Sequence, residues 1–122
     1  MKMEAEVKDQ WLLINIQSPD EFASHQLNAD LWGHGMIKEV IRGNFSFAQR
    51  TIPDHEAQSV VQTYDLTQLP AVIILDPHTA QKMIQWSGLI QPDRFLEDIL
   101  PFLDIPPSDP RAGTQHWFCI QK

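Results

Sequence analysis

The residues of this chain best suited to metal binding or nucleophilic catalysis are five histidines, one cysteine and a Ser-His pair. His25 and His34 flank a predicted helix, with Glu21 and Asp30 nearby, but this spacing matches no tetrahedral zinc motif. Ser24 and His25 are adjacent, and adjacent helical residues point about 100° apart, so the hydroxyl would not meet the imidazole ring. We therefore expect surface histidines, no metal or other cofactor, and no hydrolase.

Cys119 is the single cysteine of the chain. One thiol cannot form an intrachain disulfide, and it cannot supply a dithiol redox site. We therefore expect a reducing compartment, the cytoplasm or the nucleus or both.

The formal net charge of −7 disfavours electrostatic binding of anionic partners. An acidic surface repels phosphate backbones and anionic lipid headgroups, so we expect no nucleic acid partner and no binding to anionic membranes. No apolar run approaches the roughly 20 residues of a membrane span. The first residues, MKMEAE, lack the apolar stretch of a secretory signal.

Apolar runs and helix signals predict the elements that must position these side chains. A nearly continuous apolar run at 11–17 predicts a central strand covered on both faces, and further strands are expected at 45–49, 71–75 and 82–86. Helices are expected at about 1–10, 18–27, 36–42 and 54–64, and from Pro92 onward.

Punctuating residues predict where several of these elements begin and end. Ser18, Pro19 and Glu21 form a capping-box pattern at the start of a helix. We expect Asn28 to break that helix, Gly43 to take a left-handed conformation after the next one, and Pro101 to end or bend the last one. The turn after residue 75 carries Ala80, which must either distort the turn or adopt an unfavourable positive φ.

The expected element order determines the fold class. A strand, a helical crossover and a second strand give a parallel pair, and the hairpin that follows adds two antiparallel strands. The predicted class is α/β, thioredoxin-like, with a four-stranded mixed sheet and helices on both faces. We expect residues 1–104 to form the domain and 105–122, rich in Pro and polar residues around an apolar cluster at 117–120, to be a linker or disordered tail.

Four stretches resemble the UAS domain of UBX-domain adaptor proteins with a UBA–UAS–UBX arrangement. They are WLLINIQ at 11–17, EFASHQLNADLW at 21–32, LDPHTAQKMIQWSG at 75–88 and FLEDILPFLD at 95–104. Long segments in the right order are more specific than one short motif. The resemblance covers roughly residues 1–104. Relatives usually carry Gly where this chain has Ala80.

The resemblance implies a non-enzymatic protein-interaction domain, monomeric in isolation. In the full-length protein it would serve an adaptor that brings ubiquitylated clients to the valosin-containing AAA segregase in ubiquitin-dependent degradation, with ubiquitin ligases among its partners. The alternative is a fatty-acid-responsive domain that self-associates. That branch would be expected to show a basic patch, whereas the basic residues here are few and scattered: Lys38, Arg42, Arg50, Lys82 and Arg94.

The resemblance also indicates a degenerate redox site. Glu21 and Ser24 stand where active thioredoxin-like proteins carry the two cysteines of Cys-x-x-Cys, and neither side chain performs thiol–disulfide exchange. Leu69-Pro70 lies where such folds have a cis proline, so we expect a cis peptide bond before Pro70, as a locked turn or as a backbone edge for a peptide.

Candidate partner-binding residues lie near this degenerate site. We expect the face from Asn28 through Asp30 to Trp32, together with the loop at Leu69, to contact a partner. Trp32 lies among glycines in a predicted loop, so we expect it to be exposed, whereas Trp86 on the hairpin strand is expected to be buried.

Overall fold

The computed structural model describes residues 2–109 and places a four-stranded sheet at their centre. The strands are β1 (Trp11–Gln17), β2 (Phe45–Thr51), β3 (Ala71–Leu75) and β4 (Lys82–Ser87), in the spatial order β2-β1-β3-β4. β1 pairs with β2 in parallel, and the β1–β3 and β3–β4 pairs are antiparallel. The predicted thioredoxin-like mixed sheet is confirmed.

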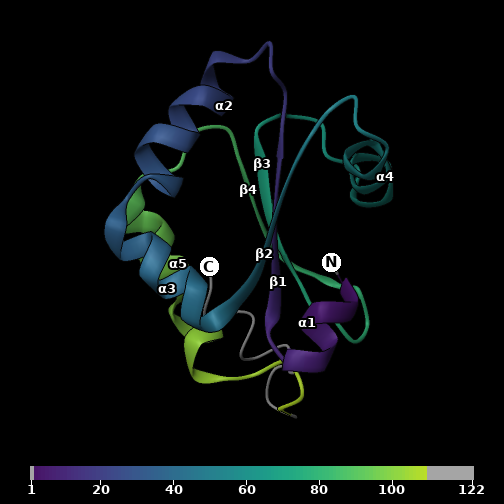
Figure 1. Cartoon of the computed structure of the whole chain (residues 1–122), viewed down its shortest axis with the longest axis vertical. Helices are drawn as coiled ribbons and strands as arrows, with labels where there is room; N and C mark the ends of the chain where they lie inside the picture. Colours follow the sequence, from purple (N-terminus) through teal and green to yellow (C-terminus); the bar gives the residue numbers. More distant parts are fainter. Residues whose placement is uncertain (1, 110–122) are drawn as a thin grey trace.

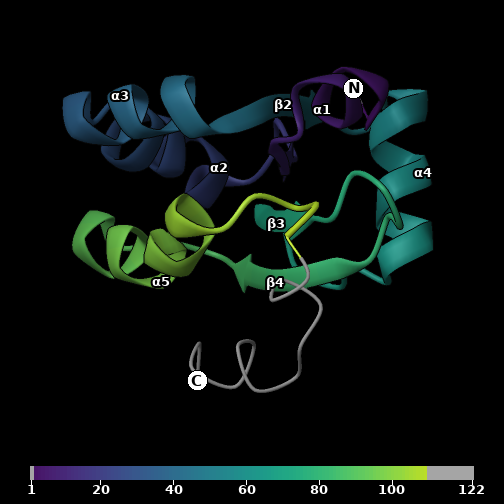
Figure 2. The ribbon, with the colours of Figure 1, turned by 90° about the horizontal axis from the view of Figure 1, so that it is seen from below.

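Helices cover both faces of the sheet, as Figures 1 and 2 show. α2 (Phe22–Leu27), α3 (Gly35–Asn44) and α5 (Pro92–Asp104) lie on one face. α1 (Lys2–Lys8) and α4 (His55–Tyr64) lie on the other face. The short π-helical segment η1 (Asn28–Trp32) continues directly from α2.

The burial of strand β1 on both faces of the sheet explains why its sequence is mostly apolar without alternation. All of its residues are buried, and successive side chains point to opposite faces. Trp11 and Leu13 belong to the core cluster on the α2/α3/α5 face, whereas Leu12, Ile14 and Ile16 belong to the cluster on the α1/α4 face.

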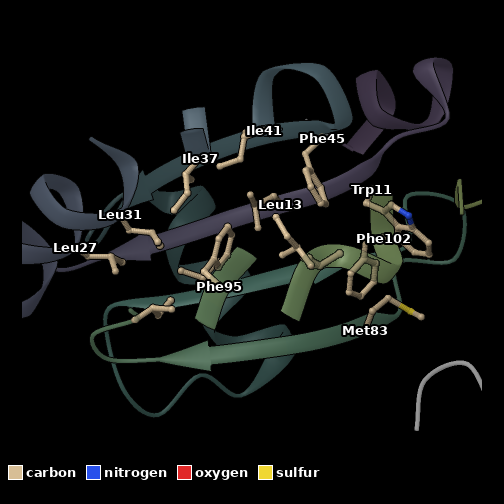
Figure 3. Packing of buried hydrophobic residues seen from close by; sticks show 14 of the residues in the cluster. Trp11, Leu13, Leu27, Leu31, Ile37, Ile41, Phe45, Met83, Phe95 and Phe102 are labelled. Atoms are coloured by element: carbon tan, nitrogen blue, oxygen red, sulfur yellow. The ribbon is translucent and has the colours of Figure 1, made fainter. Parts of the chain in front are cut away.

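Helix α5 closes the larger of the two clusters. Phe95, Ile99 and Phe102 share one helix face and are buried, and Phe95 and Phe102 project into the cluster in Figure 3. The Phe102 ring meets the Trp11 ring edge-on, with centroids 5.2 Å apart. The prediction that Pro101 ends the helix is wrong, since α5 continues to Asp104. Burial of Phe102 holds the last turn in place although proline removes one backbone donor.

The start of α2 also differs from its prediction. The capping box is absent: the helix begins at Phe22, and its first residues have no side-chain cap. Ser18 is instead buried at the end of β1, where its N–H donates to Ser24 Oγ at 3.2 Å and its carbonyl accepts from the Glu21 N–H at 3.2 Å. The backbone of Ser18 therefore forms a turn that ends the strand, and it does not begin the helix.

The segment after α2 is helical where a break was predicted. Asn28 has helical dihedrals and begins η1, which ends at Trp32 and has Gly33 as its C-cap residue. A Cβ at Gly33 would lie 2.6 Å from the Ala29 carbonyl oxygen, so only glycine fits there. Gly43 lies inside α3 and is not left-handed, because that helix extends to Asn44.

The β3–β4 turn places Ala80 at φ 64, in the left-handed region. This is the second of the two outcomes expected for Ala80, the unfavourable positive φ. Two hydrogen bonds hold the position: the Ala80 N–H donates to the Asp76 carbonyl at 2.7 Å, and Tyr64 Oη donates to the Ala80 carbonyl at 2.7 Å. The hairpin tip is thus fixed both to itself and to α4.

The packed domain extends beyond the boundary predicted at residue 104. Ile105 is buried, and its carbonyl accepts a hydrogen bond from Trp11 Nε1 at 2.8 Å. Ser108 Oγ donates to Asp9 Oδ2 at 2.6 Å. Residues 110–122, with Cys119 and the apolar cluster at 117–120, lie outside the described residues. Within the described part, no helix has the length and apolarity needed to cross a bilayer.

Candidate functional site

Glu21 and Ser24 lie at the beginning of α2, where β1 gives way to the helix. Glu21 is the N-cap residue but makes no capping hydrogen bond, and its side chain is exposed. Ser24 is buried, with its hydroxyl occupied by the Ser18 N–H. A helix N-terminus stabilises a thiolate, but a carboxylate and a hydroxyl cannot exchange disulfides. The described helix start therefore lacks the chemistry of a dithiol site.

The loop before β3 lies beside the start of the β4–α5 connection. The Leu69–Pro70 peptide bond is cis, and the Pro70 carbonyl accepts a hydrogen bond from the Gly88 N–H at 2.8 Å. Leu69 is half-buried and packs against the cluster on the α1/α4 face. It is thus separated by the sheet from Trp32, which packs on the opposite face. The structure does not unite these two predicted contact residues in one surface.

A network of carboxamides joins η1 to the sheet. Asn15 is fully buried in β1, and its Oδ1 accepts hydrogen bonds from Trp32 Nε1 and Gln49 Nε2, each at 3.0 Å. Asn28 and Gln17 exchange amide hydrogen bonds of 2.8 and 3.3 Å, and Gln49 Nε2 also donates to Asn28 Oδ1 at 2.8 Å. Because carboxamides do not titrate, this network holds its geometry without taking up or releasing a proton.

The network corrects the prediction for Trp32. Its indole is half-buried, with its N–H bonded to Asn15 and its ring 4.9 Å from Phe47 and 5.8 Å from Phe95, centroid to centroid. Asn28 is exposed, but its side-chain amide also serves the network. Both residues therefore fasten η1 to the sheet, which is a positioning role.

Sequence reasoning missed Asn15, Gln17 and Gln49. One signal was available, because an amide within a strand covered on both faces must find hydrogen-bond partners. The partners could not be read from the sequence. Gln49 opposes Asn15 only through the parallel β1–β2 register, and Asn28 reaches Gln17 only because η1 continues the helix.

The remaining predicted polar residues lie at the surface. Asp30 is exposed and accepts a hydrogen bond from Gln26 Nε2 at 2.7 Å. A ring nitrogen of His25 lies 3.0 Å from the Pro19 carbonyl oxygen. In residues 2–109, no group of three or more His, Cys, Asp or Glu side chains is arranged to hold a metal ion.

Trp86 is half-buried, whereas burial was predicted. Its Nε1 donates to Asp98 Oδ2 at 2.9 Å, and its ring centroid lies 4.9 Å from that of Phe95. A strand at the edge of the sheet leaves one side of the indole uncovered. Trp86 therefore links β4 to α5 while part of its ring remains accessible.

The five basic residues weighed above, Lys38, Arg42, Arg50, Lys82 and Arg94, do not share one element of the described chain. They are spread over α3, β2, β4 and α5. Three of them already have polar neighbours: Arg50 lies 3.5 Å from Glu56, Arg94 lies 3.4 Å from Asp98, and Lys82 donates to Gln85 at 2.6 Å.

Known proteins resemble this chain in sequence. A thioredoxin-like family model matches residues 2–77. The Arabidopsis thaliana plant UBX domain-containing protein 7 is 40% identical over 102 residues, which are 84% of this chain and 22% of that protein. The Saccharomyces cerevisiae UBX domain-containing protein 5 is 36% identical over 115 residues, 91% of this chain and 23% of that protein. This chain thus spans less than a quarter of either relative.

Solved structures share the fold at low sequence identity. A thioredoxin from Thermus thermophilus superposes with a TM-score of 0.71 at 15% identity, covering 80% of this chain and 76% of that one. A DsbH oxidoreductase gives a TM-score of 0.72 at 8% identity, covering 85% and 79%. Identities this low show the fold alone. The chain belongs to the thioredoxin-like family, as a UAS-type domain related to those of UBX domain-containing proteins.

Proposed function

We propose that this domain is a non-catalytic protein-interaction domain of a UBX adaptor. The adaptor would link ubiquitylated clients to the valosin-containing AAA segregase in ubiquitin-dependent degradation, in the cytoplasm or the nucleus. Ubiquitin ligases would be among the partners that it brings together. The relatives named as UBX domain-containing proteins support this proposal.

The observation that carries the proposal is the start of α2. At the position where this fold would carry reactive thiols, the chain has the exposed Glu21 and the hydrogen-bonded Ser24. Phe22 between them has 76% of its surface exposed and offers an aromatic side chain to a partner. The end of the domain that would perform redox chemistry therefore has the character of a contact surface.

Affinity purification of the natural protein that contains this chain tests the adaptor role. The intact protein and a form lacking residues 2–109 should be compared by quantitative mass spectrometry. We expect the deletion to lose a defined set of ubiquitin-pathway partners, while segregase binding through a UBX domain elsewhere persists. An unchanged partner set, or an intact protein without ligase, segregase or ubiquitin conjugates, would contradict the proposal.

Insulin reduction tests the absence of redox catalysis. The wild-type chain should produce no turbidity above the protein-free rate. A Glu21→Cys/Ser24→Cys variant should form a disulfide, because residues three apart at a helix start lie within the ~4.4–6.8 Å Cα separation of a disulfide. Reduction by the wild-type chain, particularly if it survives Cys119→Ser, would show that it is an enzyme.

A further inference from the structure

A hollow lies between the helical segment α2–η1 and the loop that joins β4 to α5. Its volume is about 250 Å³, below the ~300–1,000 Å³ of small-molecule sites and enough for one or two side chains. The buried Leu27 and Ile90 contribute apolar lining, and Leu89 contributes a side chain that is 59% exposed. The lining residues are Leu27, Asp30, Leu89, Ile90, Gln91 and Pro92.

The helical wall of this hollow continues as a stripe. Phe22, Gln26 and Asp30 are spaced by four residues, so they follow one another along the helical surface, and the 2.7 Å hydrogen bond from Gln26 to Asp30 confirms their adjacency. Phe22 and Leu89 are both mostly exposed. A hollow with both apolar and polar lining, beside the exposed Leu89 side chain, can accept an anchor residue of another protein together with a polar contact.

The charges around the hollow have one predominant sign. Segments 19–32 and 88–94 carry four carboxylates, on Asp20, Glu21, Asp30 and Asp93. Their single guanidinium, on Arg94, lies 3.4 Å from the carboxylate of Asp98. Asp30 belongs to the hollow itself. A partner with positive charge beside an apolar anchor would be attracted, whereas an acidic partner would be repelled.

The opposite end of β1 holds contacts between distant segments of the described chain. Asp9, just before β1, is bonded to Ser108 at 2.6 Å and to His78 of the hairpin tip at 3.1 Å. The seven residues of β1 then separate Asp9 from the turn before α2 by roughly 20 Å. The hollow therefore lies away from the contact between Asp9 and Ser108.

We propose that this hollow docks a short segment of a partner protein in which a large aliphatic or aromatic residue stands next to Lys or Arg. The apolar residue enters the hollow beside the exposed Leu89, and the basic residue meets the Asp30 carboxylate. This inference rests on the proposed function as an interaction domain and adds the chemistry of the partner.

A second hollow, of about 210 Å³, borders α4 and serves as an internal comparison. It is lined by Ile52, Pro53, Gln58, Val61, Gln62 and Leu69, none of which is charged. It offers apolar surface without an electrostatic preference, so the two sites predict different peptides.

Selection from a phage-displayed library of random peptides about twelve residues long, on the immobilised 122-residue chain, tests the proposal. We expect enriched peptides to place Lys or Arg beside Leu, Ile, Met, Phe or Trp. Their affinity, measured by fluorescence anisotropy, should fall at least ~10-fold in Asp30→Lys/Leu89→Ser. It should also fall severalfold between ~50 mM and ~500 mM NaCl, a readout that needs no variant.

Leu100→Ser/Asp104→Lys is the matched control, since it makes the same chemical changes on α5, where Leu100 is 54% exposed and Asp104 is exposed. Its affinity should change less than ~2-fold. Enriched peptides without basic residues, or equal binding to wild type and to Asp30→Lys/Leu89→Ser, would overturn the proposal. If deletion of residues 2–109 removes cellular partners but Asp30→Lys/Leu89→Ser does not, the docking site is wrong and the proposed function stands.

Discussion

The two ends of the sheet hold distant segments together by different chemistry. At the α2 end, neutral carboxamides on Asn15, Gln17, Asn28 and Gln49 join β1, β2 and η1, with Asn15 fully buried. At the hairpin end, the exposed pair Asp9 and His78, with Ser108, joins α1, the β3–β4 turn and the C-terminal segment.

The α2 end is therefore held by buried hydrogen bonds that are costly to break, whereas the hairpin end is held by exposed contacts that are easily replaced. A buried hydrogen bond has no water to replace a lost partner, so removing one group leaves the others unsatisfied. An exposed ion pair is replaced by water at little loss and is weakened by salt. The carboxamide network at the α2 end thus holds without titrating, whereas the Asp9–His78 contact at the hairpin end consists of titratable groups.

The largest effect is expected from Asn15→Ala. The change removes the acceptor for Trp32 Nε1 and Gln49 Nε2 and the donor to the Ala71 carbonyl, a contact of 3.1 Å. We expect the free energy of unfolding, from urea titration, to fall by about 3 kcal/mol. Asn44→Ala is the control: its exposed amide donates to the Val40 carbonyl, and the loss should stay within about 0.5 kcal/mol. Similar losses for both variants would contradict the claim that the buried network contributes more to stability than an exposed amide does.

A pair of glycine substitutions tests the junction after η1. Gly33→Ala places a Cβ 2.6 Å from the Ala29 carbonyl oxygen, whereas Gly43→Ala meets no atom within 4 Å in α3. We expect Gly33→Ala to lower the unfolding free energy by about 2 kcal/mol and Gly43→Ala to raise it by about 0.5 kcal/mol. Thermal and urea unfolding distinguish the two, and a neutral Gly33→Ala would mean that the backbone of η1 yields readily.

Replacing alanine by glycine should change the free energy of unfolding in opposite directions at the two ends of the sheet. Ala80→Gly at the hairpin relieves a positive φ, while Ala29→Gly loosens a helical residue. Relief of roughly 1–2 kcal/mol, offset by the greater entropy of glycine in the unfolded chain, gives Ala80→Gly a net gain of about 0.5 kcal/mol. Ala29→Gly should lose up to about 1 kcal/mol. If Ala80→Gly also lowered the free energy of unfolding, the strain assigned to Ala80 would be contradicted.

The smallest effect is expected from Ser108→Ala, and it depends on pH. The hydrogen bond from Ser108 holds the pKa of Asp9 below its ordinary value of 3.8, with His78 contributing to the same direction. A lowered folded-state pKa adds stability that is present above pH 3.8 and is lost as the pH falls through the folded value. Wild type should thus exceed Ser108→Ala by less than about 1 kcal/mol at pH 7, and the difference should shrink in acid. A difference that grows on acidification would reverse the assigned sign.

Local patterns predicted the sheet and most helices because β1 and β3 are apolar enough to require burial on both faces. The capping pattern at Ser18 misled, because tertiary structure used the same residue to end a strand. Trp32 is more buried than predicted, whereas Trp86 is less buried because β4 is an edge strand. Each indole N–H finds a partner, Asn15 or Asp98, that is near only in the folded chain.

The hollow beside Asp30 was also beyond the reach of sequence patterns. Leu27 and Leu89 are 62 positions apart, and they meet only through the packing of α2 beside the loop that leads into α5. Local signals in the sequence, such as caps and turns, contain nothing that links these two segments. Asp30 was predicted as a contact residue from its position beside the degenerate redox site, and no pattern in the sequence indicated the hollow that it lines.

Chemical-shift mapping by two-dimensional ¹H–¹⁵N NMR, with an enriched peptide added to the labelled chain, tests most directly which end of the sheet binds. We predict perturbed amides in residues 22–32 and 88–92, with the hairpin tip at 76–81 and the segment at 105–109 unchanged. Perturbations centred on the hairpin tip, or on α4, would contradict the account.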